Sequence, residues 1–176
     1  MKRNNIQIIY YMSSNKYNED DIANLLLASY HGDLDEILDF LKTIPNVNVK
    51  GNNDVTPLIL ASQQGKLDVV AFLLDRGARV NDVMTDGKTA LLMACKNGHT
   101  EIVRILMAKG ADQSLKSKGK SPRYIANSNG HTEIVKILDS YSSDPKIPPK
   151  TRGGKRRKTI KGRKGKRRKT NKRNRT

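Results

Sequence analysis

Two triplets in the sequence have the residue types that end a phosphate-binding loop. Gly87-Lys88-Thr89 and Gly119-Lys120-Ser121 each place a lysine between a glycine and a hydroxyl residue. A loop of this kind also requires a glycine five positions before the last one. Asp82 and Ser114 occupy those positions. Because the pattern is incomplete in both places, we interpret each triplet as a turn followed by a helix cap.

Three histidines and one cysteine are the other residues with chemical potential. His99 and His131 each follow a glycine, 32 positions apart, and His31 precedes one. We expect these rings to pack or cap helices. Cys95 is the single cysteine, so it can form neither an internal disulfide nor a thiolate metal cluster, and a reducing compartment is favoured. No catalytic constellation stands out, and we predict no enzymatic activity, no metal and no cofactor.

The elements that position these residues recur about every 33 residues. Alanines and glycines mark the register, at Ala28, Ala61, Ala94 and Ala126 and at Gly32, Gly65, Gly98 and Gly130. The flanking text repeats as well: Gly98-His99-Thr100-Glu101-Ile102-Val103 corresponds to Gly130-His131-Thr132-Glu133-Ile134-Val135. Such self-similarity is typical of stacked repeat architectures.

Each repeat contains the signals for two short helices. Thr56, Thr89 and Ser121 can cap a helix start, and Pro57 and Pro122 then fall at the first helical position. The glycine four residues after each register alanine can end that helix in a left-handed conformation. Acidic residues and an apolar stripe follow, which indicates a second amphipathic helix.

The pattern resembles the ankyrin repeat, with its T-P-L-H-x-A opening and G-A-D-V-N close. Thr56-Pro57-Leu58-Ile59-Leu60-Ala61 matches the opening, and Gly110-Ala111-Asp112 and Gly77-Ala78-Arg79-Val80-Asn81 match the close. The resemblance implies an all-α solenoid of about four helix-turn-helix repeats. We place a repeat domain at 20–143, divided into 20–52, 53–85, 86–117 and 118–143, after a disordered extension at 1–19.

Some positions depart from this pattern. The usual histidine of the opening motif is replaced by Ile59, Leu92 and Tyr124. In the fourth unit, Arg123 occupies the position that corresponds to Leu58. The first unit has Ala23-Asn24-Leu25 in place of T-P-L, and the last unit stops without the closing motif. We interpret these two units as terminal caps.

The resemblance implies a protein partner bound by the finger loops and the inner helices. The residues expected on that surface are Asn53, Asp54, Val55, Leu60, Gln64, Lys88, Met93, Asn97, Lys118, Lys120, Ile125 and Asn129. The alternative for each residue is solvated surface without a partner.

The C-terminal segment differs from the rest in charge. Of the 34 Lys and Arg residues, 17 follow Asp144, whereas none of the 17 Asp and Glu residues does, so the whole net charge of +17 lies there. We predict that 144–176 is a disordered polybasic tail. One sequence occurs in it twice, at Lys155, Arg156, Arg157 and Lys158 and at Lys166, Arg167, Arg168 and Lys169. Such clusters are typical of nuclear-import signals or nucleic-acid contacts.

Two functional hypotheses remain. The first is a monomeric, non-enzymatic adaptor whose repeats bind a protein while the tail binds nucleic acid or a nuclear import receptor. The second is a nucleic-acid-binding or packaging protein in which the tail is primary and the repeats anchor it. The tail is similar to endings of proteins of large DNA viruses, which would place the protein in a host cell. With no signal peptide or membrane span expected, we predict an intracellular location, in nucleus or cytoplasm; Met1 and Met12 both remain candidate initiators.

Overall fold

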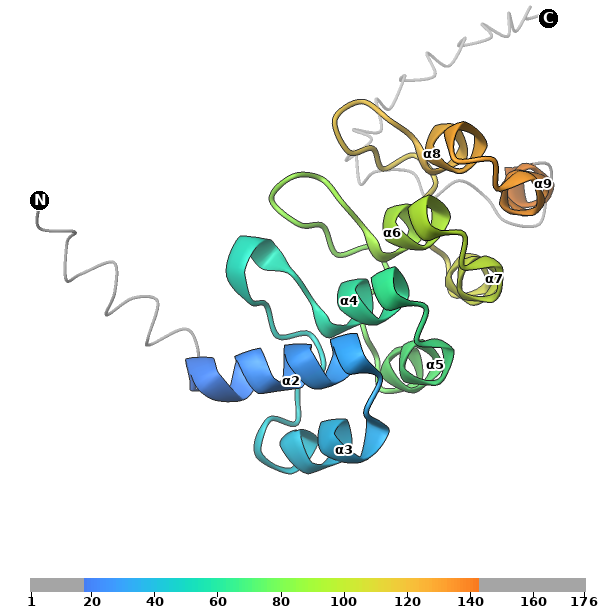
Figure 1. The fold of residues 1–176 in the computed structure, drawn as a ribbon. Coiled ribbons are helices and arrows are strands. Elements are labelled where there is room, and N and C mark those ends of the chain that lie inside the picture. Colours follow the sequence, from blue (N-terminus) through green and yellow to red (C-terminus); the bar gives the residue numbers. More distant parts are fainter. Residues whose placement is uncertain (1–17, 143–176) are drawn as a thin grey trace, which may run out of the picture. The chain divides into compact units, whose positions relative to one another are not determined.

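The computed structural model describes residues 18–142, in which eight α-helices form four stacked pairs (Figure 1). The inner row consists of α2 (Glu19–His31), α4 (Pro57–Gln64), α6 (Ala90–Asn97) and α8 (Pro122–Ser128). The outer row consists of α3 (Leu34–Thr43), α5 (Leu67–Asp75), α7 (Thr100–Ala108) and α9 (Thr132–Ser142). A short 3-10 turn, η1 (Asn52–Asp54), precedes α4. The predicted all-α repeat fold is confirmed.

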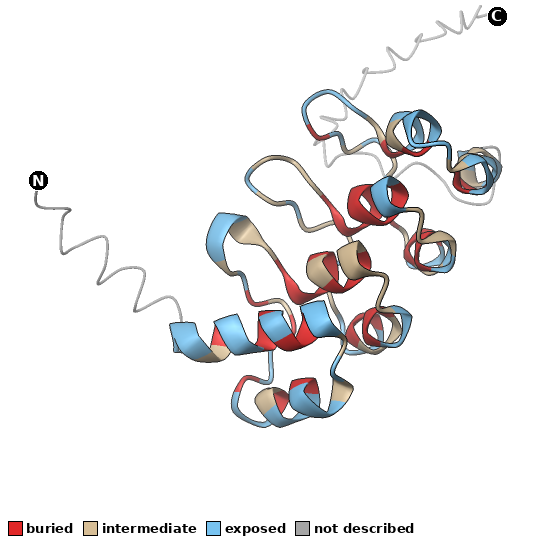
Figure 2. Cartoon of the chain, viewed as in Figure 1, coloured by how far each residue is buried: buried red, intermediate tan, exposed pale blue. Residues whose placement is uncertain are grey.

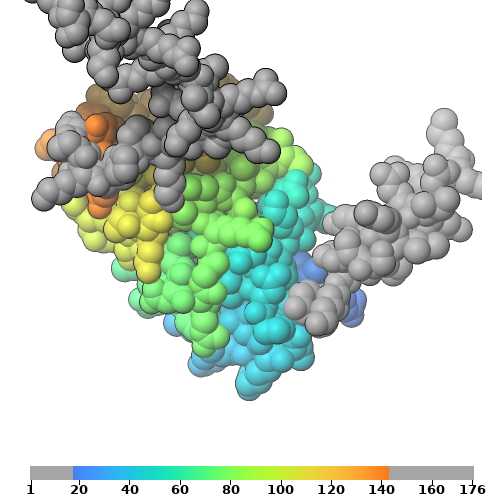
Figure 3. All heavy atoms as spheres, turned by 180° about the vertical axis from the view of Figure 1, so that it is seen from behind, coloured from blue at the N-terminus to red at the C-terminus, as the bar shows by residue number. Residues whose placement is uncertain are grey.

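Two predicted segments fall wholly or mostly outside the described residues. These are the extension at 1–19, of which only the last two residues are described, and the polybasic tail at 144–176. The chain divides into two units, Met1–Asp144 and Pro145–Thr176, and all described residues belong to the first unit. In a view from behind, successive repeats of that unit form adjoining bands in chain order (Figure 3).

The predicted hydroxyl caps begin three of the inner helices. The side-chain oxygens of Thr56, Thr89 and Ser121 accept hydrogen bonds from the backbone N–H three residues later, at 3.3, 3.2 and 3.2 Å. Pro57 and Pro122 stand at the first helical positions, where the missing N–H has no partner to lose. The sequence therefore determines where these helices start.

The first inner helix begins earlier than its counterparts. Helix α2 has 13 residues, against eight in α4, because no Thr-Pro pair starts it at Ala23. Asn18 caps it instead and accepts a hydrogen bond from the backbone N–H of Asp20 at 3.4 Å. The first turn is acidic, and its negative charges stabilise the helix by interacting with the positive end of the helix dipole.

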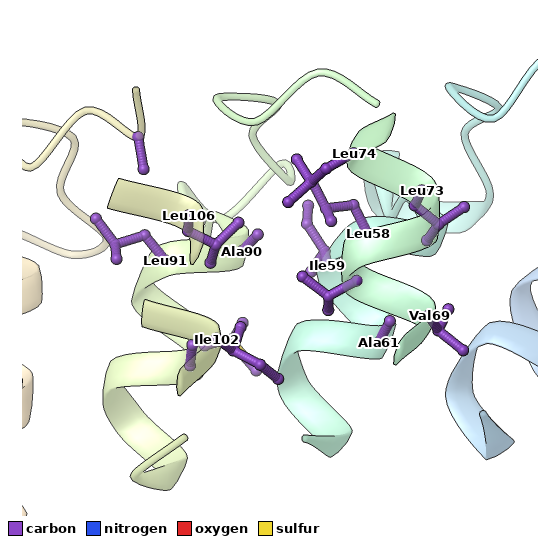
Figure 4. Packing of buried hydrophobic residues seen from close by; sticks show 14 of the residues in the cluster. Leu58, Ile59, Ala61, Val69, Leu73, Leu74, Ala90, Leu91, Ile102 and Leu106 are labelled. Atoms are coloured by element: carbon purple, nitrogen blue, oxygen red, sulfur yellow. The ribbon is translucent and has the colours of Figure 1, made fainter. Parts of the chain in front are cut away.

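The core runs continuously between the helix rows. Leu58, Ile59, Leu91, Ile102 and Leu106 are each at most 2% exposed and lie between neighbouring pairs (Figure 4). Figure 2 shows buried residues in the inner helices, most densely in α4 and α6. Since each repeat packs mainly on its neighbours, the stability of the stack is shared among the interfaces between repeats.

The closing motif connects one repeat to the next. Asn48 donates from Nδ2 to the carbonyl of Gly77 at 3.1 Å, and its Oδ1 accepts from the backbone N–H of Arg79 at 2.8 Å. Asn81, 33 residues later, makes the same two bonds to Gly110 and Asp112, at 3.2 and 2.8 Å. The asparagines of the first two units thus fix the loops after the outer helices of the units that follow them.

The last described repeat exposes positions that are buried in earlier ones. Ile59 and Leu92 are 1% exposed, but Tyr124 at the same register is 56% exposed, because no further helix pair within residues 18–142 covers it. Arg123 also points to solvent and forms two bonds to Asp139, at 2.7 and 3.1 Å. These hydrogen bonds from Arg123 lower the pKa of Asp139. Polar substitutions are tolerated here because the position is exposed.

The cysteine is a packing residue, as predicted from its place in the repeat. Cys95 is fully buried in the core, and this burial raises the pKa of its thiol to about 12. The reactive thiolate is therefore both scarce and inaccessible near neutral pH. We expect no modification of the folded protein by a maleimide at pH 7.5, and full modification in denaturant. Rapid labelling of the folded protein, followed by mass spectrometry, would contradict this assignment.

None of the helices in residues 18–142 has the length and apolar character needed to cross a membrane.

Candidate binding surface

Finger loops project beside the inner helices between successive repeats (Figure 1). In the third finger, residues 84–88, the backbone N–H of Met84 donates to the carbonyl of Lys88 at 2.9 Å. In the fourth finger, residues 117–120, Ser117 and Lys120 exchange two backbone hydrogen bonds of 3.2 and 2.9 Å. The predicted turn formers are confirmed, since Gly87 and Gly119 adopt φ values of 82° and 76° in these turns.

Lys118 occupies an unfavourable backbone position at the tip of the fourth finger. Its φ is 48°, and with Gly119 it forms the two-residue turn between Ser117 and Lys120. Both central residues of such a turn need positive φ, which suits Asn, Asp and Gly much better than a lysine. The turn holds the lysine beside the inner helices despite this cost.

Neighbouring fingers are bonded side by side. The hydroxyl of Ser117 donates to the carbonyl of Asp86 at 2.8 Å, and the backbone N–H of Thr85 donates to the carbonyl of Asn53 at 3.0 Å. The backbones approach closely, because a Cβ at position 87 would lie 2.9 Å from the carbonyl oxygen of Lys116. The fingers therefore have a defined arrangement before any partner binds.

The third and fourth repeats enclose a surface hollow of about 330 Å³. Its apolar lining comes from two inner helices, with Leu92 and Met93 in α6 and Ile125 in α8. Four lysines also line it, so we call it the lysine-rimmed hollow. Its other lining residues are Ser117, Ser128 and Asn129, and the lysines are Lys88, Lys96, Lys118 and Lys120.

The hollow carries a net positive charge. Lys88 is paired with Asp86, at 2.7 Å between Nζ and Oδ2. The hydrogen bond from Lys88 lowers the pKa of Asp86 below its usual value, and the nearby charge of Lys118 adds to this effect. Within residues 18–142, Lys96, Lys118 and Lys120 form no ion pair, and all three are exposed. The site therefore favours an anionic ligand.

Half of the predicted contact residues meet in this hollow, namely Lys88, Met93, Lys118, Lys120, Ile125 and Asn129. Met93 is only 6% exposed, so only a small part of its side chain is open to a ligand. Asn129 also donates to the carbonyl of Lys96 at 3.3 Å. Two of these residues belong to the third repeat and four to the fourth, and together they form a single surface.

The other predicted residues lie elsewhere on the repeats. Asn97 donates to the carbonyl of Gln63 at 2.7 Å, which uses its amide within the stack. Leu60 and Gln64 are half-buried along α4, and Val55 packs against the core. Asn53 and Asp54 form the turn η1, with φ values of 60° and 58°. None of these lines the lysine-rimmed hollow.

Two of the three histidines, His99 and His131, have the packing role that their positions predict, whereas His31 is exposed at the end of α2. Nε2 of His99 lies 3.0 Å from the carbonyl oxygen of Gln63, and Nε2 of His131 lies 3.2 Å from that of Lys96. Each ring covers the glycine that ends the preceding inner helix. These bonds join each repeat to the one before it.

Sequence reasoning missed four lining residues: Leu92, Lys96, Ser117 and Ser128. A signal for two of them was present, because Lys96 and Ser128 stand three residues after Met93 and Ile125. Residues at this spacing share a helix face. Leu92 and Ser117 could not be predicted in this way, because both are buried and expose little of their side chains to the hollow.

These features define a helical repeat protein with a candidate binding surface and, within residues 18–142, no group of three side chains placed to hold a metal. The family described as Ankyrin repeats (3 copies) matches residues 2–84, 25–117 and 79–148. The chain belongs to the ankyrin repeat family, whose members are typically non-enzymatic scaffolds that bind other proteins. No curated protein matched the chain.

Proposed function

We propose that the protein is a non-enzymatic adaptor that binds another protein through its fingers and inner helices. The convergence of six predicted contact residues on the lysine-rimmed hollow carries this proposal. The fingers are bonded to one another, so the surface needs little ordering when a partner binds.

The polybasic tail supplies the second activity of the proposed adaptor, either nuclear targeting or binding to a polyanion. Its support is the sequence, because Lys155, Arg156 and the other cluster residues lie outside the described residues. Each phosphate contact by Lys or Arg releases condensed counterions, so tail binding to nucleic acid would show little sequence preference and steep salt dependence.

A second candidate makes the tail the primary element of a nucleic-acid-binding or packaging protein. One observation favours it, which is that the entire net charge of +17 follows Asp144. In that case the repeats would serve only to anchor the protein to an assembly.

Capture experiments distinguish the two. Full-length protein and a truncation after Asp144 are immobilised and exposed to cell lysate with and without nuclease. We expect both to retain the same protein partner, and nuclease to leave it bound. If all retained material is RNA or DNA and disappears with the tail, the adaptor proposal is wrong and the packaging hypothesis gains.

The role of the tail is measured separately with mixed-sequence duplex DNA and RNA, from about 50 to about 300 mM salt. We expect only the full-length chain to bind, with log affinity falling linearly as log salt rises. If the full-length chain does not bind at about 150 mM salt, a transport signal becomes the better interpretation of the tail. Localisation of the tail fused to a reporter protein then becomes the direct test.

A further inference from the structure

We propose that the lysine-rimmed hollow binds an acidic peptide segment of the partner, with one aliphatic side chain of that segment inserted between α6 and α8. This inference rests on the proposed adaptor function and adds the chemistry of the ligand. The reasons are the charge at the rim, the apolar side chains inside it and the strained position of one rim lysine.

Charge complementarity identifies the anionic part of the ligand. Three exposed lysines on the hollow, Lys96, Lys118 and Lys120, have no carboxylate partner within residues 18–142. Lys96 belongs to helix α6 of the third repeat, whereas Lys118 and Lys120 belong to the finger of the fourth repeat. A chain of Asp and Glu residues across the hollow would reach all three, and such pairing guides both association and orientation.

The apolar lining identifies the second part of the ligand. Leu92, Met93 and Ile125 belong to two adjacent inner helices and line the same hollow as the lysines. A volume of about 330 Å³ is near the lower limit for ligand sites. Methionine adapts its shape to an inserted group, and an aliphatic side chain would be surrounded by apolar contacts on the helix side.

The backbone of the fourth finger supports a role for its lysine. Lys118 keeps a φ of 48°, a conformation in which glycine or asparagine would be less strained. The corresponding residue of the third finger is Asp86, which does not have a positive φ, so of these two fingers only the fourth has this strain. Strain that is maintained to place a charge beside a hollow is typical of binding sites.

The same observations argue against two other ligands. Single-stranded nucleic acid is usually held by aromatic rings that stack on its bases, but no ring lines this hollow. Tyr124 lies outside it, with Nζ of Lys120 5.8 Å from its ring centre. The polybasic tail of the chain itself would be repelled by the lysines. A protein segment with the opposite charge is therefore favoured.

The test uses a fluorescent peptide of about twelve residues in which Asp and Glu flank one central leucine. The protein is truncated after Asp144, because the tail would bind any acidic peptide. The buried core of the described residues lies between Ile22 and Leu138, so the truncation leaves the repeats complete. We expect saturable binding by fluorescence anisotropy, and clearly weaker binding when serine replaces the leucine of the peptide.

Matched charge reversals locate the site on the protein. Lys118→Glu should weaken peptide binding about tenfold. Lys136→Glu changes the net charge equally on the outer helix α9, away from the hollow, and should weaken it less than about twofold. Lys118→Gly removes the charge and relieves the positive φ, so it should weaken binding without lowering the melting temperature.

Three results would overturn the inference. They are equal effects of Lys118→Glu and Lys136→Glu, equal affinity for the leucine and serine peptides, and tighter binding of duplex DNA than of the peptide by the truncated protein. If the truncated chain and its Lys118→Glu variant capture the same protein from lysate equally well, the adaptor function stands and this site is refuted. Loss of all such capture would instead refute the adaptor function.

Discussion

Ile59→Ala should lower the free energy of unfolding by about 2–5 kcal/mol. The side chain is 1% exposed in the cluster that joins α4 to its neighbours (Figure 4). Its removal loses apolar burial and leaves a cavity that the stacked helices can only partly close. Since a domain of this size is stable by only about 5–15 kcal/mol, the loss is a large part of the total. Urea denaturation followed by circular dichroism measures it.

Tyr124→Ala is the matched control, because position 124 has the register of position 59 in the last repeat. Ser121 caps its helix as Thr56 caps that of Ile59, so the backbone setting is the same. The side chain is 56% exposed, and we expect a change within about 0.5 kcal/mol. Similar losses for both variants would mean that something covers Tyr124 in solution, and would refute our account of the end of the stack.

A local loss of this size also bears on cooperativity. In a stack where repeats contact mainly their neighbours, stability is the sum of repeat and interface contributions. Weakening the interface near Ile59 can separate the unfolding of the first repeats from that of the last two. The Ile59→Ala transition should then become broader than that of the wild type, whereas the Tyr124→Ala transition should keep its slope.

The sequence allowed the helices to be placed because their signals are local. A hydroxyl cap, a proline at the first helical position and a left-handed glycine act within a few residues, as in Thr56, Pro57 and Gly65. The same signals failed for the first repeat, where Asn18 moved the helix start upstream. A capping asparagine is a weaker marker when no proline follows it.

The candidate site was only partly accessible to sequence reasoning, for a physical reason. Its residues come from two repeats, and which of them converge depends on how closely the helices and fingers approach. Met93 and Ile125 share a register but differ in exposure, since Met93 is buried and Ile125 half-buried. Likewise the spacing placed His131 after a helix-ending glycine, but only the packing of repeats shows that its ring reaches the carbonyl of Lys96.

The contact between a histidine and a glycine should make Gly65→Ala destabilising by about 2–3 kcal/mol. Gly65 ends α4 with a φ of 73°, and a Cβ there would lie 2.6 Å from Cε1 of His99. The ring would have to move away, which breaks its 3.0 Å hydrogen bond to the carbonyl of Gln63. Alanine therefore adds the cost of a left-handed conformation to the loss of a bond between repeats.

Gly32→Ala separates these two contributions. Gly32 has the same register and a φ of 88°, but its Cβ would meet the flexible side chain of Lys66, which can move aside. We expect only the conformational cost there, about 1–2 kcal/mol. In the Gly65→Ala background, His99→Ala should lower the free energy of unfolding little further, because the ring has already lost its hydrogen bond to Gln63. If the two losses simply add, the ring tolerates the new methyl group and the destabilisation at Gly65 comes from its backbone conformation alone.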